Sequence, residues 1–138
     1  MKFLFKFSIF SFSVMLIGSS CKKQTIDQKY NCSAVPRKIQ FSLYTEKDFS
    51  GNNENIVFTL SIRTSTSRVL WDSVLAPMKV KDIPGVANKL VIEKLVTVDD
   101  CSLLKVGFIY AIENVGISWF WDKSNAGENF KKVEFNFQ

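Results

Sequence analysis

Hydrophobic and polar residues alternate along most of the chain from residue 36 to its end. Ile39, Phe41 and Leu43 alternate with polar side chains, and the same period of two returns at residues 56–62, 104–112 and 133–137. This period is that of a half-buried β-strand, and the many β-branched and aromatic residues agree with it. No segment after residue 21 shows a helical period.

Three further segments complete the expected strands. Residues 90–96 and 117–121 are strand-like, and residues 69–75 are apolar on both phases before Pro77 interrupts them. About seven short strands separated by turn residues predict an all-β fold. We expect residues 36–138 to form one antiparallel two-sheet sandwich with an immunoglobulin-like outline.

The first twenty residues have the layout of a secretory signal. Lys2 and Lys6 precede an apolar run at residues 7–17, and small residues follow at 18–20. This order predicts a helical signal peptide over residues 1–20. The apolar run is shorter than the roughly 20 residues that a membrane-spanning helix needs. A retained N-terminal anchor helix is the alternative.

The residues that end this leader, LIGSSC at positions 16–21, resemble the lipobox of a bacterial lipoprotein. The resemblance implies cleavage before Cys21 and acylation of that cysteine. The match departs from the strict pattern at Gly18, where leucine is preferred. Each buried methylene of an acyl chain contributes about 0.8 kcal/mol, so several chains hold a protein firmly on a membrane. The polar residues that follow predict a flexible tether over 21–35.

Three segments extend this resemblance into the domain. They are FSLYTEKDFS at 41–50, LWDSVLAPM at 70–78 and IENVG at 112–116. Together with the leader they resemble a group of small Bacteroidota lipoproteins, which implies a β-sandwich on the envelope but no catalytic motif or ligand. Lys22 is not the aspartate that favours inner-membrane retention, which implies the outer membrane. No acidic run follows Cys21, and its absence favours an orientation toward the periplasm.

Composition excludes several classes of function. The chain has 138 residues, 18 Lys and Arg, 13 Asp and Glu, and no histidine. Histidine-based triads, metal sites and proton shuttles are therefore excluded. The basic surplus is spread along the chain, so we expect no nucleic-acid partner. Without a phosphate loop or a nucleophile elbow, the sequence predicts a non-enzyme with no cofactor and no metal.

Two cysteines remain if Cys21 is acylated. An even remainder in an exported chain predicts a disulfide between Cys32 and Cys101. A loop of roughly 70 residues closed in this way contributes about 4 kcal/mol in the chain-entropy model. Two free thiols that never meet are the alternative.

The tryptophans are the candidate ligand platform. On a strand, Trp119 and Trp121 share one face, and Ser118 and Phe120 share the other. Because serine marks its face as the wetter one, the pattern predicts that both tryptophans point into the core. Exposed tryptophans, Trp71 included, would instead bind a protein or a glycan. Their exposure separates such a binding module from a structural or assembly component of the outer membrane that has no soluble ligand.

Two short polar patterns are weaker candidates. Asp72-Ser73-Val74 resembles the O-glycosylation site of Bacteroidota, which makes Ser73 a candidate for a glycan. We favour an outward polar pair on a strand there. The loop at residues 48–55 is rich in oxygen ligands but lacks the spacing of a calcium-binding EF-hand, so we expect an ordinary solvated loop.

Overall fold

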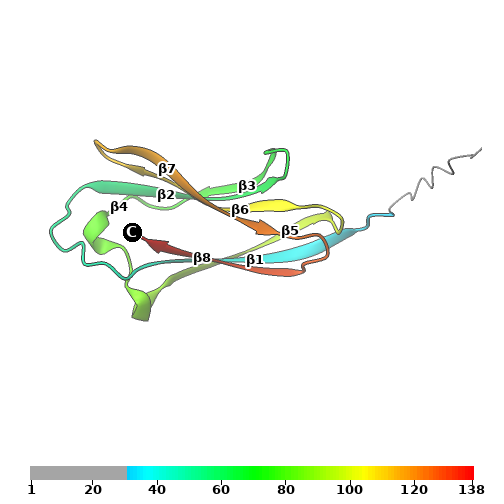
Figure 1. Cartoon of the computed structure of the whole chain (residues 1–138), viewed down its shortest axis with the longest axis horizontal. Coiled ribbons are helices and arrows are strands. Elements are labelled where there is room, and N and C mark those ends of the chain that lie inside the picture. The colour runs from blue at the N-terminus through cyan, green and yellow to red at the C-terminus, as the bar shows by residue number, and fades with distance from the viewer. Residues whose placement is uncertain (1–30) are drawn as a thin grey trace, which may run out of the picture.

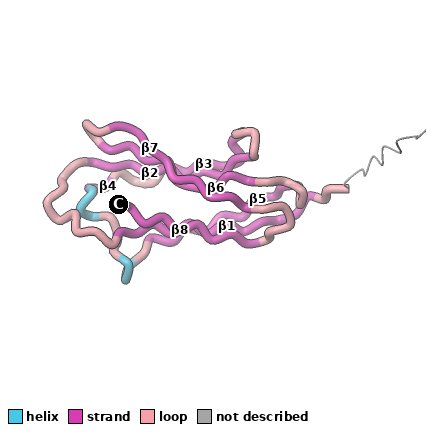
Figure 2. Tube along the Cα trace, in the orientation of Figure 1, coloured by secondary structure: helices cyan, strands magenta, loops and turns pink. Residues whose placement is uncertain are grey.

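The computed structural model describes residues 31–138, which form two β-sheets packed face to face (Figures 1 and 2). The three-stranded sheet has, in spatial order, β5 (Leu90–Asp99), β1 (Ala34–Thr45) and β8 (Phe130–Phe137). The five-stranded sheet has β3 (Val69–Val74), β2 (Asn55–Thr64), β6 (Leu104–Ile112) and β7 (Gly116–Ser124), and β4 (Met78–Lys79) also pairs with β2. Two short 3-10 helices, η1 (Val80–Asp82) and η2 (Val86–Asn88), precede β5.

The core lies between the sheets, where the period-two pattern sends its apolar residues. Phe58 on β2 and Phe108 on β6 meet Phe135 on β8, with ring centroids 6.5 Å and 5.2 Å from that of Phe135. Burying each large apolar side chain stabilises a fold by about 1.5–3 kcal/mol, so this layer dominates the stability of the domain. The all-β, two-sheet sandwich is therefore confirmed. The other buried hydrophobic residues of β1, β2, β6 and β8 are Ile39, Phe41, Leu43, Ile56, Leu60, Ile62, Leu104, Val106, Val133 and Phe137.

Strand order and some boundaries differ from the prediction. β1 pairs with β8 in parallel, so the sandwich is not wholly antiparallel. β1 and β2 lie in different sheets, whereas the first two strands of an immunoglobulin constant domain share one. The outline is thus immunoglobulin-like in layers and size but not in strand order. β1 begins at Ala34, two residues before the expected domain start, and the two-residue β4 raises the number of strands to eight within residues 31–138.

A buried arginine holds one end of the sandwich. Arg37 is fully buried because it lies in the same inward phase of β1 as the core residue Ile39. Its two terminal nitrogens donate to four carbonyls, those of Ser102 at 2.8 Å, Asn125 at 3.0 Å, Asp99 at 3.0 Å and Asp100 at 2.6 Å. One guanidinium therefore joins the β5–β6 loop to the β7–β8 loop. The sequence analysis missed this residue, because an arginine on a strand is usually solvated.

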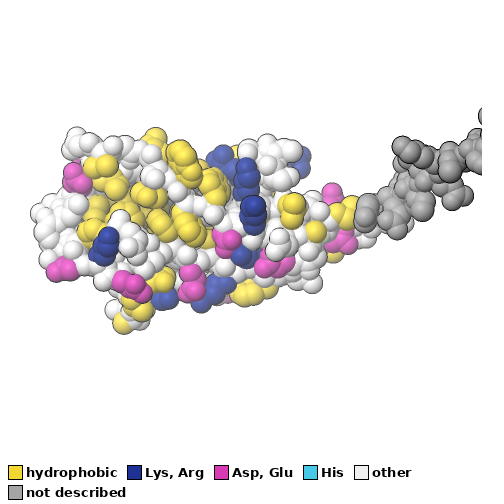
Figure 3. Space-filling model, in the orientation of Figure 1, with side chains coloured by type: hydrophobic (Ala, Val, Ile, Leu, Met, Phe, Trp, Pro, Cys, Tyr) yellow, Lys and Arg dark blue, Asp and Glu magenta, His cyan; other side chains and the backbone are white. Residues whose placement is uncertain are grey.

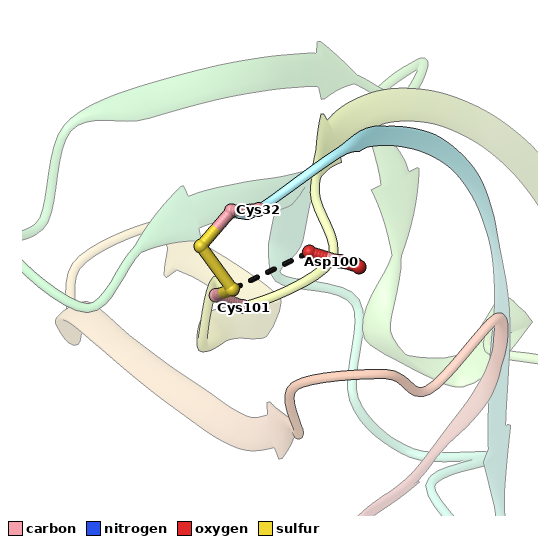
Figure 4. Close-up of side chains that lie close together, drawn as sticks. All are labelled: Cys32, Asp100 and Cys101. Atoms are coloured by element: carbon pink, nitrogen blue, oxygen red, sulfur yellow. Dashed lines mark hydrogen bonds between the residues drawn. A yellow bond between two sulfur atoms is a disulfide. The ribbon is translucent and has the colours of Figure 1, made fainter. Parts of the chain in front are cut away.

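The disulfide predicted between Cys32 and Cys101 is present at the same end (Figure 4). Its sulfurs lie 2.11 Å apart and join residues separated by 69 positions. The amide of Ser33 donates to Oδ1 of Asp100 at 3.1 Å, and the amide of Asp100 donates to the Ser33 carbonyl at 2.9 Å. The start of the domain is therefore attached to the β5–β6 loop. Cys21, the predicted signal peptide and most of the predicted tether lie outside the described residues.

Candidate interaction surface

The outer face of the three-stranded sheet carries ion pairs between its own strands. Lys38 on β1 lies 2.6 Å from Glu93 on β5, and Glu134 on β8 lies 2.9 Å from Lys132 and 3.3 Å from Lys89. The hydrogen bond from Lys38 lowers the pKa of Glu93, and those from Lys132 and Lys89 lower the pKa of Glu134. These charges are thus paired with one another, and the exposed apolar residues of this face, Val91, Leu95 and Phe130, lie among them.

The outer face of the five-stranded sheet is apolar near the β6–β7 hairpin. On β7, Ile117 is 70% exposed and Trp119 is 65% exposed. The register places Trp119 opposite Ile109 and Ile117 opposite Ala111 on β6. The same two rows continue across β2 to Val57 and to Thr59, beyond which Val74 on β3 is 67% exposed. We call the apolar members of these rows the outer patch: Val57, Val74, Ile109, Ala111, Ile117 and Trp119.

The inward prediction for Trp119 and Trp121 is wrong, because Phe120 takes the inward position. The ring of Phe120 stacks on that of Phe135, with centroids 5.0 Å apart and planes 15° apart. Adjacent residues of a strand face opposite ways, so Trp119 and Trp121 lie on the outer face. β7 is at the margin of its sheet, where an inward position is only partly covered. A single Ser118 is therefore a poor marker of the wet face.

Trp121 is held within a polar cluster and is only partly exposed. The guanidinium of Arg63 on β2 lies 5.3 Å from the centre of its ring, a distance typical of a cation–π contact. Arg63 also lies 3.6 Å from Asp72 on β3, and Ser61 donates to Asp72 at 2.5 Å. Arg63 donates to Ser61 at 2.9 Å as well. These polar groups satisfy one another, so Trp121 contributes mainly to the packing of its own sheet.

Trp71 and Ser73 both lie on the inward phase of β3. Trp71 is opposite Ile62, and its ring centre is 6.0 Å from that of Phe41. Trp71 thus covers the core at the β3 margin and is not a free platform. Ser73 is half-buried opposite Leu60, whereas Asp72 faces outward. The expected outward polar pair is therefore wrong, and the hydroxyl proposed for glycosylation is on the less accessible face.

Basic residues border the outer patch on the side nearer the disulfide. The register aligns Arg63, Lys105 and Lys123 in one row across β2, β6 and β7. Arg63 is paired with Asp72, but Lys105 and Lys123 form no ion pair within residues 31–138. Like charges directly opposite each other on a sheet repel. The two lysines line a shallow depression of about 260 Å³, together with Ser65, Leu103 and Leu104.

Figure 3 shows the side of the sandwich on which β7 and β8 form the sheet margins, with the outer face of the five-stranded sheet seen edge-on. Hydrophobic side chains gather over β7 and between β7 and β8, and Lys and Arg side chains lie beside them toward the end at which β1 begins. An apolar patch with a charged border is typical of a surface that binds another molecule.

Two other clusters use their polar atoms internally. Asp48 Oδ1 accepts the amide of Ser50 at 2.9 Å, and this backbone hydrogen bond lowers the pKa of Asp48. The Sγ of Cys101 lies 3.4 Å from Oδ1 of Asp100 (Figure 4), and because a disulfide sulfur has no proton to donate, this is a close contact and not a hydrogen bond. Neither sulfur is a thiolate in this state, so Cys32, Asp100 and Cys101 do not present a metal-ligand set.

No helix within residues 31–138 is long and apolar enough to cross a membrane. No protein-family model, curated protein or solved structure matches the chain. The candidate surface therefore rests on its own geometry and chemistry.

Proposed function

We propose that this protein is a lipid-anchored, non-catalytic module of the bacterial outer membrane that binds another protein through the outer patch. Acylated Cys21 is the proposed anchor, with the domain toward the periplasm. The observation that carries the binding role is the exposure of Trp119 and Ile117 over a continuous apolar surface. Tryptophan is enriched at binding hot spots, and an exposed tryptophan loses the stabilisation that burial of its large apolar surface would give. This exposure favours a binding module over an assembly component without a ligand.

The surroundings of Trp119 favour a protein partner over a glycan. A sugar stacked on an aromatic ring needs polar side chains beside the ring to pair with its hydroxyls. The cross-strand neighbours of Trp119 and Ile117 are Ile109 and Ala111, which offer no such side chains. The polar side chain in the row of Trp119 is Thr59, two strands away on β2, and Arg63 and Asp72 on the same face are already bonded to each other. An apolar protein surface meets these conditions better.

The start of the described chain and the outer patch lie toward opposite ends of the domain. The chain enters beside Cys101, at the start of β6, and the β6–β7 hairpin lies at the far end (Figure 1). Nine residues of β6 separate the two ends by roughly 30 Å at the rise of a β-strand. An anchor at Cys21 would therefore leave the hairpin end of the domain free for a partner.

The test is recovery of a partner that depends on Trp119. The full chain, expressed with a C-terminal tag in a bacterium that acylates lipoproteins, is cross-linked and purified as wild type, Trp119→Ser and Leu95→Ser. Leu95 is the matched control, because it is 62% exposed on the other sheet. We expect one protein to be recovered with the wild type and Leu95→Ser and lost with Trp119→Ser. Equal recovery from all three, or no specific protein, would refute the binding role.

Intact-mass analysis of the same sample tests the anchor. We expect the mass of the chain from Cys21 onward with acyl groups attached. An unmodified Cys21 in a chain that keeps its leader would contradict the proposed location.

A further inference from the structure

One margin of the five-stranded sheet is unprotected over residues 116–121. β7 pairs only with β6, so its other edge has free backbone groups. Natural proteins protect such edges with charges, prolines or bulges. Residues 116–121 of β7, with the sequence GISWFW, contain none of the charges or prolines, and the β6–β7 register shows no shift.

The other three margins within the described residues carry such devices. β3 is short, and its register with β2 shifts between Ile62 and Arg63. β5 carries Glu93 and Lys94, and β8 carries two lysines and a glutamate. The bare stretch of β7 is thus specific to the strand that also carries the exposed tryptophan.

The accessible part of this edge ends at Asp122, whose side chain occupies the next outward backbone amide. Its Oδ1 accepts the amide of Lys123 at 2.7 Å, and its Oδ2 lies 2.8 Å from Lys131 on β8. The Lys123 amide therefore points away from the β6 ladder. Because backbone groups alternate along an antiparallel strand, those of Ile117, Trp119 and Trp121 also point toward the free edge. The accessible edge runs through these three residues and ends at Asp122.

We propose that an extended segment of a partner protein adds to this edge as a further strand of the sheet. The inference rests on the protein-binding role proposed above and specifies its mode. Side chains of an added strand on the outer face would lie beside Ile117, Trp119 and Trp121, which favours apolar residues at alternate positions. At the next outward-facing position of β7, a side chain of the added segment would lie beside Lys123. A carboxylate there would relieve the repulsion between Lys123 and Lys105.

The partner chemistry is therefore an acidic residue followed, at every second position, by apolar residues. In an antiparallel arrangement the acidic residue comes first, and in a parallel arrangement it comes last. A second copy of this chain paired through β7 is the competing occupant. In a second copy, the residue that follows Trp121 and Asp122 is Lys123 and not an acidic residue. The test therefore also measures whether the protein is a monomer or a dimer.

The experiment uses the full acylated chain in detergent and two fluorescent peptides, SDTVTITVS and its reverse, SVTITVTDS. Binding is followed by fluorescence anisotropy, and hydrogen exchange by mass spectrometry locates the protected amides. We expect one peptide to bind and to protect the segment containing residues 116–121. Binding of neither peptide to the wild type would overturn strand addition.

Two variants at Ile117 separate edge binding from face binding. Ile117→Thr removes the apolar side chain, and Ile117→Pro also removes the outward amide, which an edge strand tolerates. We expect Ile117→Pro to bind about tenfold more weakly than Ile117→Thr, as the loss of one backbone hydrogen bond predicts. Equal binding would overturn strand addition and leave the outer patch as a face-on site, so the proposed function would survive.

A charge exchange keeps the test decisive if the proline variant does not fold. We expect Lys123→Glu to weaken the aspartate peptide and to bind a peptide with lysine at that position instead. No change with either peptide would overturn the predicted acidic residue. Sedimentation of the wild type as a dimer that Ile117→Pro converts to a monomer would assign the edge to a second copy and overturn the partner segment.

Discussion

Replacing Arg37 with methionine removes the guanidinium but keeps a side chain of similar length. Arg37 makes four hydrogen bonds, each of a kind worth about 1.5–3 kcal/mol when one group is charged. Their sum overestimates the effect, because they belong to one network and because the methionine incurs no cost for burying a charge. The Nε of Arg37 is buried without a partner, which lowers the net value further.

The carbonyls that Arg37 contacts set the lower bound of the stability that Arg37→Met loses. Those of Asp99, Asp100 and Asn125 also accept a backbone amide, from Ser102, Gly127 and Glu128 respectively. The carbonyl of Ser102 has Arg37 as its partner, and leaving a buried acceptor unpaired costs about 1–3 kcal/mol. We expect Arg37→Met to destabilise the domain by about 3 kcal/mol, which lowers the melting temperature by roughly 12–24 °C for a domain of about 100 residues.

Chemical and thermal unfolding of the wild type, Arg37→Met and Arg37→Lys measures this loss. Lysine restores a charge but not the planar fork that reaches two loops, so Arg37→Lys should recover only part of the stability. Hydrogen exchange should increase most in the β5–β6 and β7–β8 loops. A melting temperature for Arg37→Met within a few degrees of the wild type would refute the structural role assigned to the guanidinium.

Three further predictions concern the same framework. Replacing Cys32 and Cys101 with serine should lower the free energy of unfolding by about 4 kcal/mol in denaturant titrations, and two free thiols in the wild type purified from its native host would contradict this. Gly107→Ala should destabilise the domain by about 2 kcal/mol or more and increase hydrogen exchange in β7, because its Cβ would overlap the carbonyl oxygen of Phe120. An unchanged melting temperature would argue against this close approach. Partial burial acts to raise the pKa of Asp122, but the hydrogen bonds from Lys131 and from the Lys123 amide outweigh it and lower the pKa. The stabilisation by the Asp122 carboxylate is therefore complete above the usual carboxyl pKa of about 4 and is lost as the pH falls through the lowered pKa. We expect the difference in unfolding free energy between the wild type and Asp122→Asn to shrink on acidification. A difference that stays constant with pH would show that this carboxylate is not linked to folding.

Some of this fold could be predicted from local pattern alone. Strands such as 39–43 and 104–112 were recognisable because one face of each is buried, and burial imposes a period of two on the sequence. The pairing of Cys32 with Cys101 could be anticipated from a count of cysteines and from the export that the leader predicts. These features depend on short-range periodicity or on arithmetic, which a linear sequence contains.

Only the tertiary structure decided which strands are neighbours and which faces stay exposed. Nothing local to β1 and β8 specifies their parallel pairing, because the same alternation fits any partner strand. Trp119 is exposed because β7 lies at a sheet margin and Phe120 stacks on a distant ring. Arg37 is buried because four carbonyls from loops 62 to 88 residues away converge on it. Contacts made at such separations determine the environment of a side chain, and the sequence around that side chain does not contain them.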